Sequence, residues 1–146
     1  MKVIAVHDVG KAVFRSGIEG QIAGGVSMGL GYALSEEVVF SDGRPLNDSF
    51  RDYRLPTTMD VPHIDPIILE KENATSPDDI IGVGEPTTIP TAAAVANAVY
   101  DAVGVLVRDL PMTPERVYSA LNTGGATEET KSIPIRDEAG DLGNIL

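Results

Sequence analysis

The stretch GIEGQIAGGVSMGLGYAL, residues 17–34, decides how this chain can fold. It contains the apolar repeat of a helix and, in the same residues, many glycines that oppose a helix. Apolar residues recur in it every four positions, as on one face of a helix: Ile18, Ile22, Val26, Leu30 and Leu34. Glycines stand at positions 17, 20, 24, 25, 29 and 31. Each glycine inside a helix costs about 0.5–1 kcal/mol relative to alanine. We therefore expect a helix that holds only through close packing against another backbone or a ligand.

Short strands are expected on both sides of this helix. Residues 2–7 form an apolar run with β-branched members, and residues 37–40 form a second one. Residues 67–69 form a third, which we expect to begin near His63. Runs this short predict a small and mixed set of strands.

The segment between these strands contains turn signals. Asp42-Gly43 is a favoured pair for a tight hairpin turn. Pro45 and Asn47 interrupt the sequence that would supply the partner strand, so no partner is obvious. Residues 48–66 hold several prolines and little periodicity, which predicts extended pieces and turns on the surface.

The second half of the chain predicts two further helices. Apolar residues fall at helical spacings over positions 92–106, among good helix formers. Thr113 suits an N-cap and Pro114 suits the first helical position, so a short helix is expected through Leu121. The resulting fold class is α+β, with short mixed strands and packed helices.

Composition excludes several classes of function. The chain has 146 residues and a formal net charge of -11, which opposes binding to nucleic acid or to an anionic membrane. It has no cysteine and only two histidines, so we expect no metal site built from its own side chains. No apolar run is long enough to span a bilayer and the start lacks the order of a secretory signal, which favours a cytoplasmic location.

The chain length suits one folded unit. We interpret residues 1–122 as that unit, and residues 123–146 as an acidic tail that is either disordered or docked on a neighbour.

One candidate for chemistry is the carboxylate in IGVGEPTTIP, residues 81–90. Glu85 follows Gly82-Val83-Gly84 and precedes the strongest predicted helix. The plain interpretation is a helix-start residue, because acidic side chains are common in first turns. The functional interpretation is a general base, with the glycines letting a bulky group approach the backbone.

A second candidate is Gln21, which lies within the glycine-rich stretch. Its amide offers donors and acceptors to the edge of a heterocycle. The alternative is that the glycines serve tight helix packing while Gln21 is simply exposed.

Taken together, these stretches resemble a known family. The matching segments are VHDVGKA at 6–12, the stretch from Ile18 to Pro62 containing IEGQIAGG and YRLP, and IGVGEPTTIPTAAAVANAVYDAV at 81–103. They closely resemble the C-terminal part of the molybdenum-binding subunit of the xanthine dehydrogenase/aldehyde oxidase family. The resemblance runs in order from about Val3 to Leu121, so the chain is expected to be a partial domain of a larger subunit.

The resemblance implies a reaction and three site residues. In that family a molybdenum–molybdopterin centre hydroxylates an activated carbon of a heterocycle or an aldehyde, with oxygen derived from water. The glutamate of the G-x-G-E motif, here Glu85, acts as the general base. Gln21 matches the glutamine that hydrogen-bonds the pterin, and Gly84 matches the glycine beside the metal.

The resemblance also implies partners. The family's molybdenum-binding chains are several times longer, and the missing part supplies most cofactor loops and much of the substrate pocket. Electrons leave through iron–sulfur and flavin (FAD) domains or subunits, which this chain lacks. The isolated chain is therefore expected to be inactive, since one base and one pterin contact cannot position a substrate.

Two other interpretations stay open at this level. The chain could be a non-catalytic assembly module related to that subunit. It could also be a small hydrolase that uses Glu85 and one histidine, although neither histidine lies in a recognisable nucleophile or metal motif.

Overall fold

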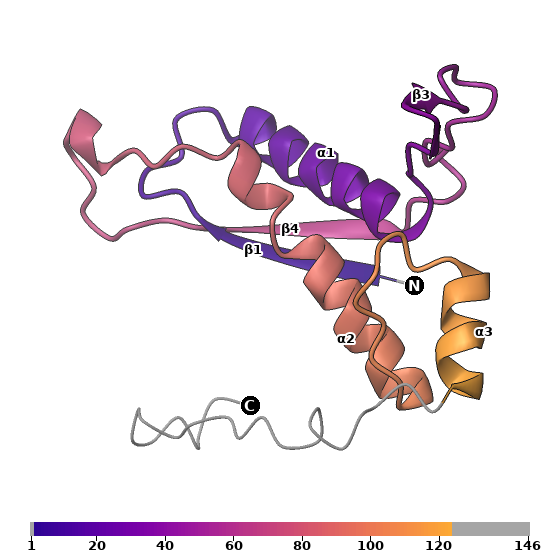
Figure 1. Cartoon of the computed structure of the whole chain (residues 1–146). Helices are drawn as coiled ribbons and strands as arrows, with labels where there is room; N and C mark the ends of the chain where they lie inside the picture. Colours follow the sequence, from indigo (N-terminus) through magenta and orange to yellow (C-terminus); the bar gives the residue numbers. More distant parts are fainter. Residues whose placement is uncertain (1, 124–146) are drawn as a thin grey trace.

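The computed structural model describes residues 2–123 and contains both helices and short strands (Figure 1). The elements in chain order are β1 (Lys2–Asp8), α1 (Arg15–Leu34), β2 (Phe40–Ser41), β3 (Arg44–Pro45), β4 (His63–Leu69), the 3-10 helices η1 (Pro77–Asp79) and η2 (Glu85–Thr87), α2 (Thr91–Val103) and α3 (Pro114–Asn122). The expected α+β class is confirmed. The expected acidic tail lies outside the described residues except for Thr123, so the division into 1–122 and 123–146 stays a prediction.

The main sheet consists of β1 and β4, which pair in parallel from Lys2 opposite His63 to Asp8 opposite Leu69. A parallel pair needs a long crossover, and α1 forms part of it. Figure 1 shows α1 running along the two strands, while α2 and α3 extend away from them. The main core lies between α1 and the sheet. Its buried members are Ala5, Ile22, Val26 and Leu30, with Val3, Ile64 and Ile68 packed against them.

Helix α1 forms in spite of its glycines because, at two of them, neighbouring elements pack directly against the helix backbone. A Cβ at Gly25 would overlap the side chain of Thr87, and a Cβ at Gly29 would overlap that of Thr91. Thr87 and Thr91 are both buried. The close packing expected at the glycines is present, but the backbone of α1 mainly meets threonine side chains of η2 and of the start of α2 instead of another backbone.

A second core joins α2 and α3 to the end of α1. Ala33, Val107 and Met112 are its buried members. Helix α2 ends at Val103, earlier than the apolar spacing indicated, because Gly104 takes a left-handed conformation with φ of 71°. Helix α3 begins as expected, with the Thr113 hydroxyl accepting a hydrogen bond from the Arg116 amide at 3.3 Å.

The predicted strand at 37–40 is mostly wrong. Only Phe40 belongs to a strand, and β2 pairs antiparallel with β3, the partner that the sequence did not reveal. The turn between them is the expected Asp42-Gly43 pair, with φ of 48° and 75°. Pro45 is tolerated because the strand is a two-residue edge, where a missing backbone N–H costs little.

Of the residues described, none forms a helix that is both long and apolar enough to cross a membrane.

The glycine contact can be tested by unfolding. Gly25→Ala puts a methyl group where Thr87 lies, and overpacking of this kind costs typically about 1–3 kcal/mol. Gly24→Ala is the matched control, since a Cβ there meets nothing within 4 Å, and the alanine should stabilise the helix by about 0.5–1 kcal/mol. Urea unfolding of the 146-residue chain measures both. Equal stability of the two variants would contradict the proposed packing.

Candidate functional site

The loop that carries Glu85 is fixed to the core on its downstream side. Val83 packs against the main core. The Thr87 hydroxyl donates a hydrogen bond to the carbonyl of Gly84 at 2.7 Å, and the Thr87 amide donates to the same oxygen at 3.3 Å. Because Thr87 is wedged against Gly25, these bonds hold the Gly84-Glu85 turn next to α1.

The structure brings the three predicted site residues onto two packed elements. Gly84 and Glu85 are exposed at the start of η2. Gln21 is exposed on α1, four positions before Gly25, which is about one helical turn, or 5.4 Å, along the axis. The turn of α1 that follows Gln21 is thus the one on which η2 rests.

The plain interpretation of Glu85, as a residue that opens the long helix, is wrong. Glu85 begins η2 instead, a single 3-10 turn, and α2 starts only at Thr91. A turn this short aligns too few peptide units to give a macrodipole that would favour a carboxylate. What places Glu85 is therefore its attachment through Thr87, not a helix N-terminus.

Four of the six glycines of α1 form two pairs with different surroundings. Gly25 and Gly29 face buried threonines, so for them the structural interpretation is correct. Gly20 and Gly24 flank Gln21, and a Cβ at either would meet nothing within 4 Å. At these two positions the backbone of α1 is therefore open, and a flat group could approach it.

Within residues 2–123, no three acidic or histidine side chains are grouped in a way that could ligate a metal ion. His7 and Asp8 lie at the end of β1, where the Asp8 carboxylate accepts a hydrogen bond from the Gly10 amide at 2.9 Å.

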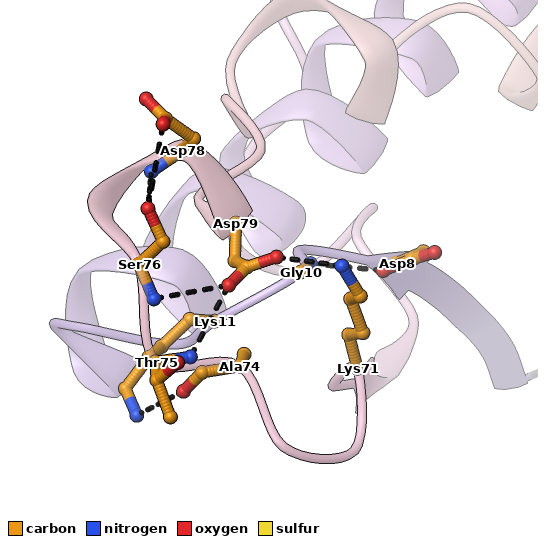
Figure 2. A network of polar contacts seen from close by, with 9 residues as sticks. All are labelled: Asp8, Gly10, Lys11, Lys71, Ala74, Thr75, Ser76, Asp78 and Asp79. Atoms are coloured by element: carbon orange, nitrogen blue, oxygen red, sulfur yellow. Dashed lines mark hydrogen bonds and ion pairs between the residues drawn. The ribbon is translucent and has the colours of Figure 1, made fainter.

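The upstream side of the Glu85 loop is anchored by a polar cluster around Asp79, which Figure 2 shows. The Asp79 carboxylate pairs with Lys71 at 2.6 Å and accepts hydrogen bonds from the amides of Ser76 at 3.0 Å and Thr75 at 3.2 Å. Neither this cluster nor the role of Thr87 was predicted from the sequence. One sequence signal for the role of Thr87 was available. Gly25 and Gly29 are four residues apart, and so are Thr87 and Thr91, which pack against them.

A family model and solved structures indicate the class of protein to which this segment is similar. Residues 1–62 match the family model of a molybdopterin cofactor-binding domain. The fold is similar to quinoline 2-oxidoreductase from Pseudomonas putida 86, with a TM-score of 0.73 and 36% identity over 82% of this chain and 16% of that one. It is also similar to the aldehyde oxidoreductase from Desulfovibrio gigas, with a TM-score of 0.71 and 31% identity over 82% of this chain and 13% of that one.

Sequence comparison with individual proteins indicates which subunit of these enzymes the chain is similar to. The chain is 37% identical over 126 residues to the xanthine dehydrogenase molybdenum-binding subunit of Escherichia coli O157:H7, covering 85% of this chain and 17% of that subunit. It is 35% identical over 124 residues to a nicotinate dehydrogenase subunit of Pseudomonas putida, covering 85% of this chain and 10% of that subunit. The resemblance is confirmed: the chain is similar in sequence and fold to a segment of the molybdenum-binding subunits of the xanthine dehydrogenase/aldehyde oxidase family. It spans less than a fifth of these relatives' length.

Acid should loosen the Asp79 cluster. Hydrogen bonds from Lys71 and from the Ser76 amide lower the pKa of Asp79 below its ordinary 3.8. Because the folded-state pKa is the lower one, the carboxylate stabilises the folded loop above the ordinary pKa, and this is lost as the pH falls through the lowered value. We expect the amides of Thr75 and Ser76 to lose hydrogen-exchange protection only below about pH 4.

Asp79→Asn is the control for this pH dependence, because its amide does not titrate. Its protection at Thr75 and Ser76 should be weaker at neutral pH and should not change with acid. If the unaltered chain and the variant show the same protection at every pH, Asp79 does not hold this loop.

Proposed function

We propose that this chain is the segment of a molybdenum hydroxylase subunit that supplies Glu85 as general base and Gln21 as a contact to the pterin. The observation that carries the proposal is the seating of the Gly84-Glu85 turn on α1, one helical turn after Gln21. This arrangement gives an exposed carboxylate and an exposed amide on adjoining elements. Both are side chains that the resemblance assigns to the centre.

The described residues fit a pterin better than they fit a metal. An amide can donate through Nε2 and accept through Oε1, which matches the mixed edge of a heterocycle. Gly20, Gly24 and Gly84 leave space that a larger side chain would fill. The same residues offer no ligand cluster of their own, so the metal would be carried by the pterin.

The role left to Glu85 is proton transfer. When bound, the molybdenum–pterin group would supply the oxidising capacity and lower the pKa of a water molecule. Glu85 would then take up a proton of that water at a carboxylate oxygen. As the water oxygen bonds to a substrate carbon, the hydrogen and two electrons of the C–H bond broken there would pass to the molybdenum–pterin group. The relatives' names include xanthine, nicotinate and quinoline enzymes and an aldehyde enzyme, which supports a heterocycle or an aldehyde as the substrate class.

Uncovered apolar surface supports a requirement for the rest of the subunit. Parallel strands are normally covered on both faces. Among the described residues, α1 covers one face, while Ile4 (59% exposed), Val6 (52%), Ile67 (41%) and Leu69 (51%) stay exposed on the other. An open and largely apolar groove of about 780 Å³ also runs between β1 and α2.

We infer that the remainder of a molybdenum-binding subunit covers these surfaces and completes the pocket. Iron–sulfur and flavin domains or subunits would carry the electrons away, since a chain without cysteine cannot ligate an iron–sulfur cluster. We expect the 146-residue chain alone to show no turnover, because it lacks the groups that position a substrate.

The first test is Glu85→Gln in the complete subunit. Removing a general base typically lowers turnover by about 10²–10⁴-fold, while molybdenum and pterin content should stay at the level of the unaltered enzyme. Glu72→Gln is the matched control, because it makes the same chemical change at an exposed position of the preceding loop. Normal turnover of the Glu85 variant would sink the proposal and favour the assembly-module interpretation.

The second test is Gln21→Ala, which removes the proposed pterin contact. Loss of one neutral hydrogen bond costs about 0.5–1.5 kcal/mol, so the complete subunit should lose cofactor on dialysis about 2- to 10-fold more readily. Met28→Ala is the control, since Met28 is exposed on the same helix two turns further on. Equal cofactor retention by the two variants would remove Gln21 from the site.

A further inference from the structure

The segment from Lys71 to Ile81 is tied to the end of β1 by main-chain bonds. The Lys71 amide donates to the Gly10 carbonyl at 2.7 Å, the Lys11 amide donates to the Asp79 carbonyl at 3.0 Å, and the Ile81 amide donates to the Val9 carbonyl at 3.0 Å. These three bonds join both ends of the segment to three consecutive residues after β1. The Glu85 loop therefore starts from a fixed point.

Asp79 takes part in this attachment through both its carboxylate and its carbonyl. Its carboxylate binds the start of the segment, through Lys71, Thr75 and Ser76, and its carbonyl binds the chain after β1, through Lys11. The ion pair alone would be worth little, because Lys71 is 65% exposed. The carboxylate is only 17% exposed and has three donors, so losing it would leave several polar groups without their partner.

The backbone beside Asp79 is also tightly fitted. Gly10 has φ of 61°, and a Cβ there would overlap the Asp79 carbonyl and lie 3.2 Å from the Ile81 side chain. The close approach confirms that the chain after β1 and the segment around Asp79 are packed backbone against backbone. A small displacement of Asp79 would be transmitted to Ile81.

The path from this point to the site is short and has few other supports. Five residues separate Asp79 from Glu85, and two of them, Gly82 and Gly84, add backbone freedom. Between Ile81, whose amide binds Val9, and Thr87, which packs against Gly25, the side chain of Val83 packs against the core. The orientation of Glu85 thus depends on the upstream attachment as well as on the Thr87 side.

We propose that Asp79 is a positioning residue for Glu85: by binding Lys71 and the Thr75 and Ser76 amides, it fixes the upstream end of the loop that carries the base. This rests on the proposed function of Glu85. Asp79 touches neither the substrate nor the cofactor in this proposal. It acts through the main chain of residues 80–84.

The experiment compares Asp79→Asn with Asp78→Asn in the complete subunit. Asp78 is the adjacent aspartate on η1, and its carboxylate contacts only the Ser76 hydroxyl at 3.4 Å among the described residues. Misplacing a catalytic group by about 1 Å can cost roughly 10²-fold in rate, so we expect kcat of the Asp79 variant to fall about 10- to 10²-fold. KM and molybdenum content should change less than about twofold, and Asp78→Asn should behave as the unaltered enzyme.

A double variant separates positioning from a general structural role. If Asp79 acts through Glu85, Asp79→Asn should cause no further loss in a Glu85→Gln background, because the group being positioned is already gone. The same fold-loss in both backgrounds, loss of cofactor, or unchanged kcat in Asp79→Asn would each overturn the positioning role. Hydrogen exchange should also quicken at residues 80–84 and not in β4.

The outcomes distinguish this inference from the function on which it rests. An inactive Glu85→Gln enzyme with a fully active Asp79→Asn enzyme overturns only the positioning role. A fully active Glu85→Gln enzyme overturns the proposed base, and the positioning of that base with it.

Discussion

The close approach of the α1 backbone to Thr87 and Thr91 is the contact on which the rest of the arrangement depends. At Gly25 and Gly29 the helix has no side chain, so the threonines fill the space that a Cβ would need. Two threonines are thereby buried, one at the end of η2 and one at the start of α2. The same contact supports the helix, fixes the Glu85 turn and sets where α2 departs.

Much of the fold could be predicted because its signals are local. The spacing of Ile22, Val26 and Leu30 indicated the buried face of α1, and Thr113-Pro114 indicated where α3 begins. The β2–β3 pairing was missed because two-residue strands carry almost no periodic signal. The end of α2 was placed too late because apolar spacing continues past Gly104, where the backbone already leaves the helix.

The candidate site was only partly predictable. Glu85, Gln21 and Gly84 were predicted as site residues through the resemblance to a family, and no local pattern would have separated them from a helix start and an exposed amide. Their support could not be predicted, because it depends on contacts between distant segments. Thr87 meets Gly25 across 62 positions, and Asp79 meets the chain after β1 across about 70. Such pairs are visible only once the backbone path is known.

The parallel pairing of β1 and β4 has a consequence for how this segment can fold. Lys2 and His63 are neighbours in the sheet although roughly sixty residues separate them. Their pairing requires closing a long loop, and the entropy lost in doing so is not offset by contacts between residues close in sequence. Until the strands pair and α1 covers one face, both expose apolar side chains and unpaired backbone groups, and the face away from α1 stays apolar even in the folded segment. Pairing of these two strands is therefore expected to be a slow and aggregation-prone step in the folding of this segment.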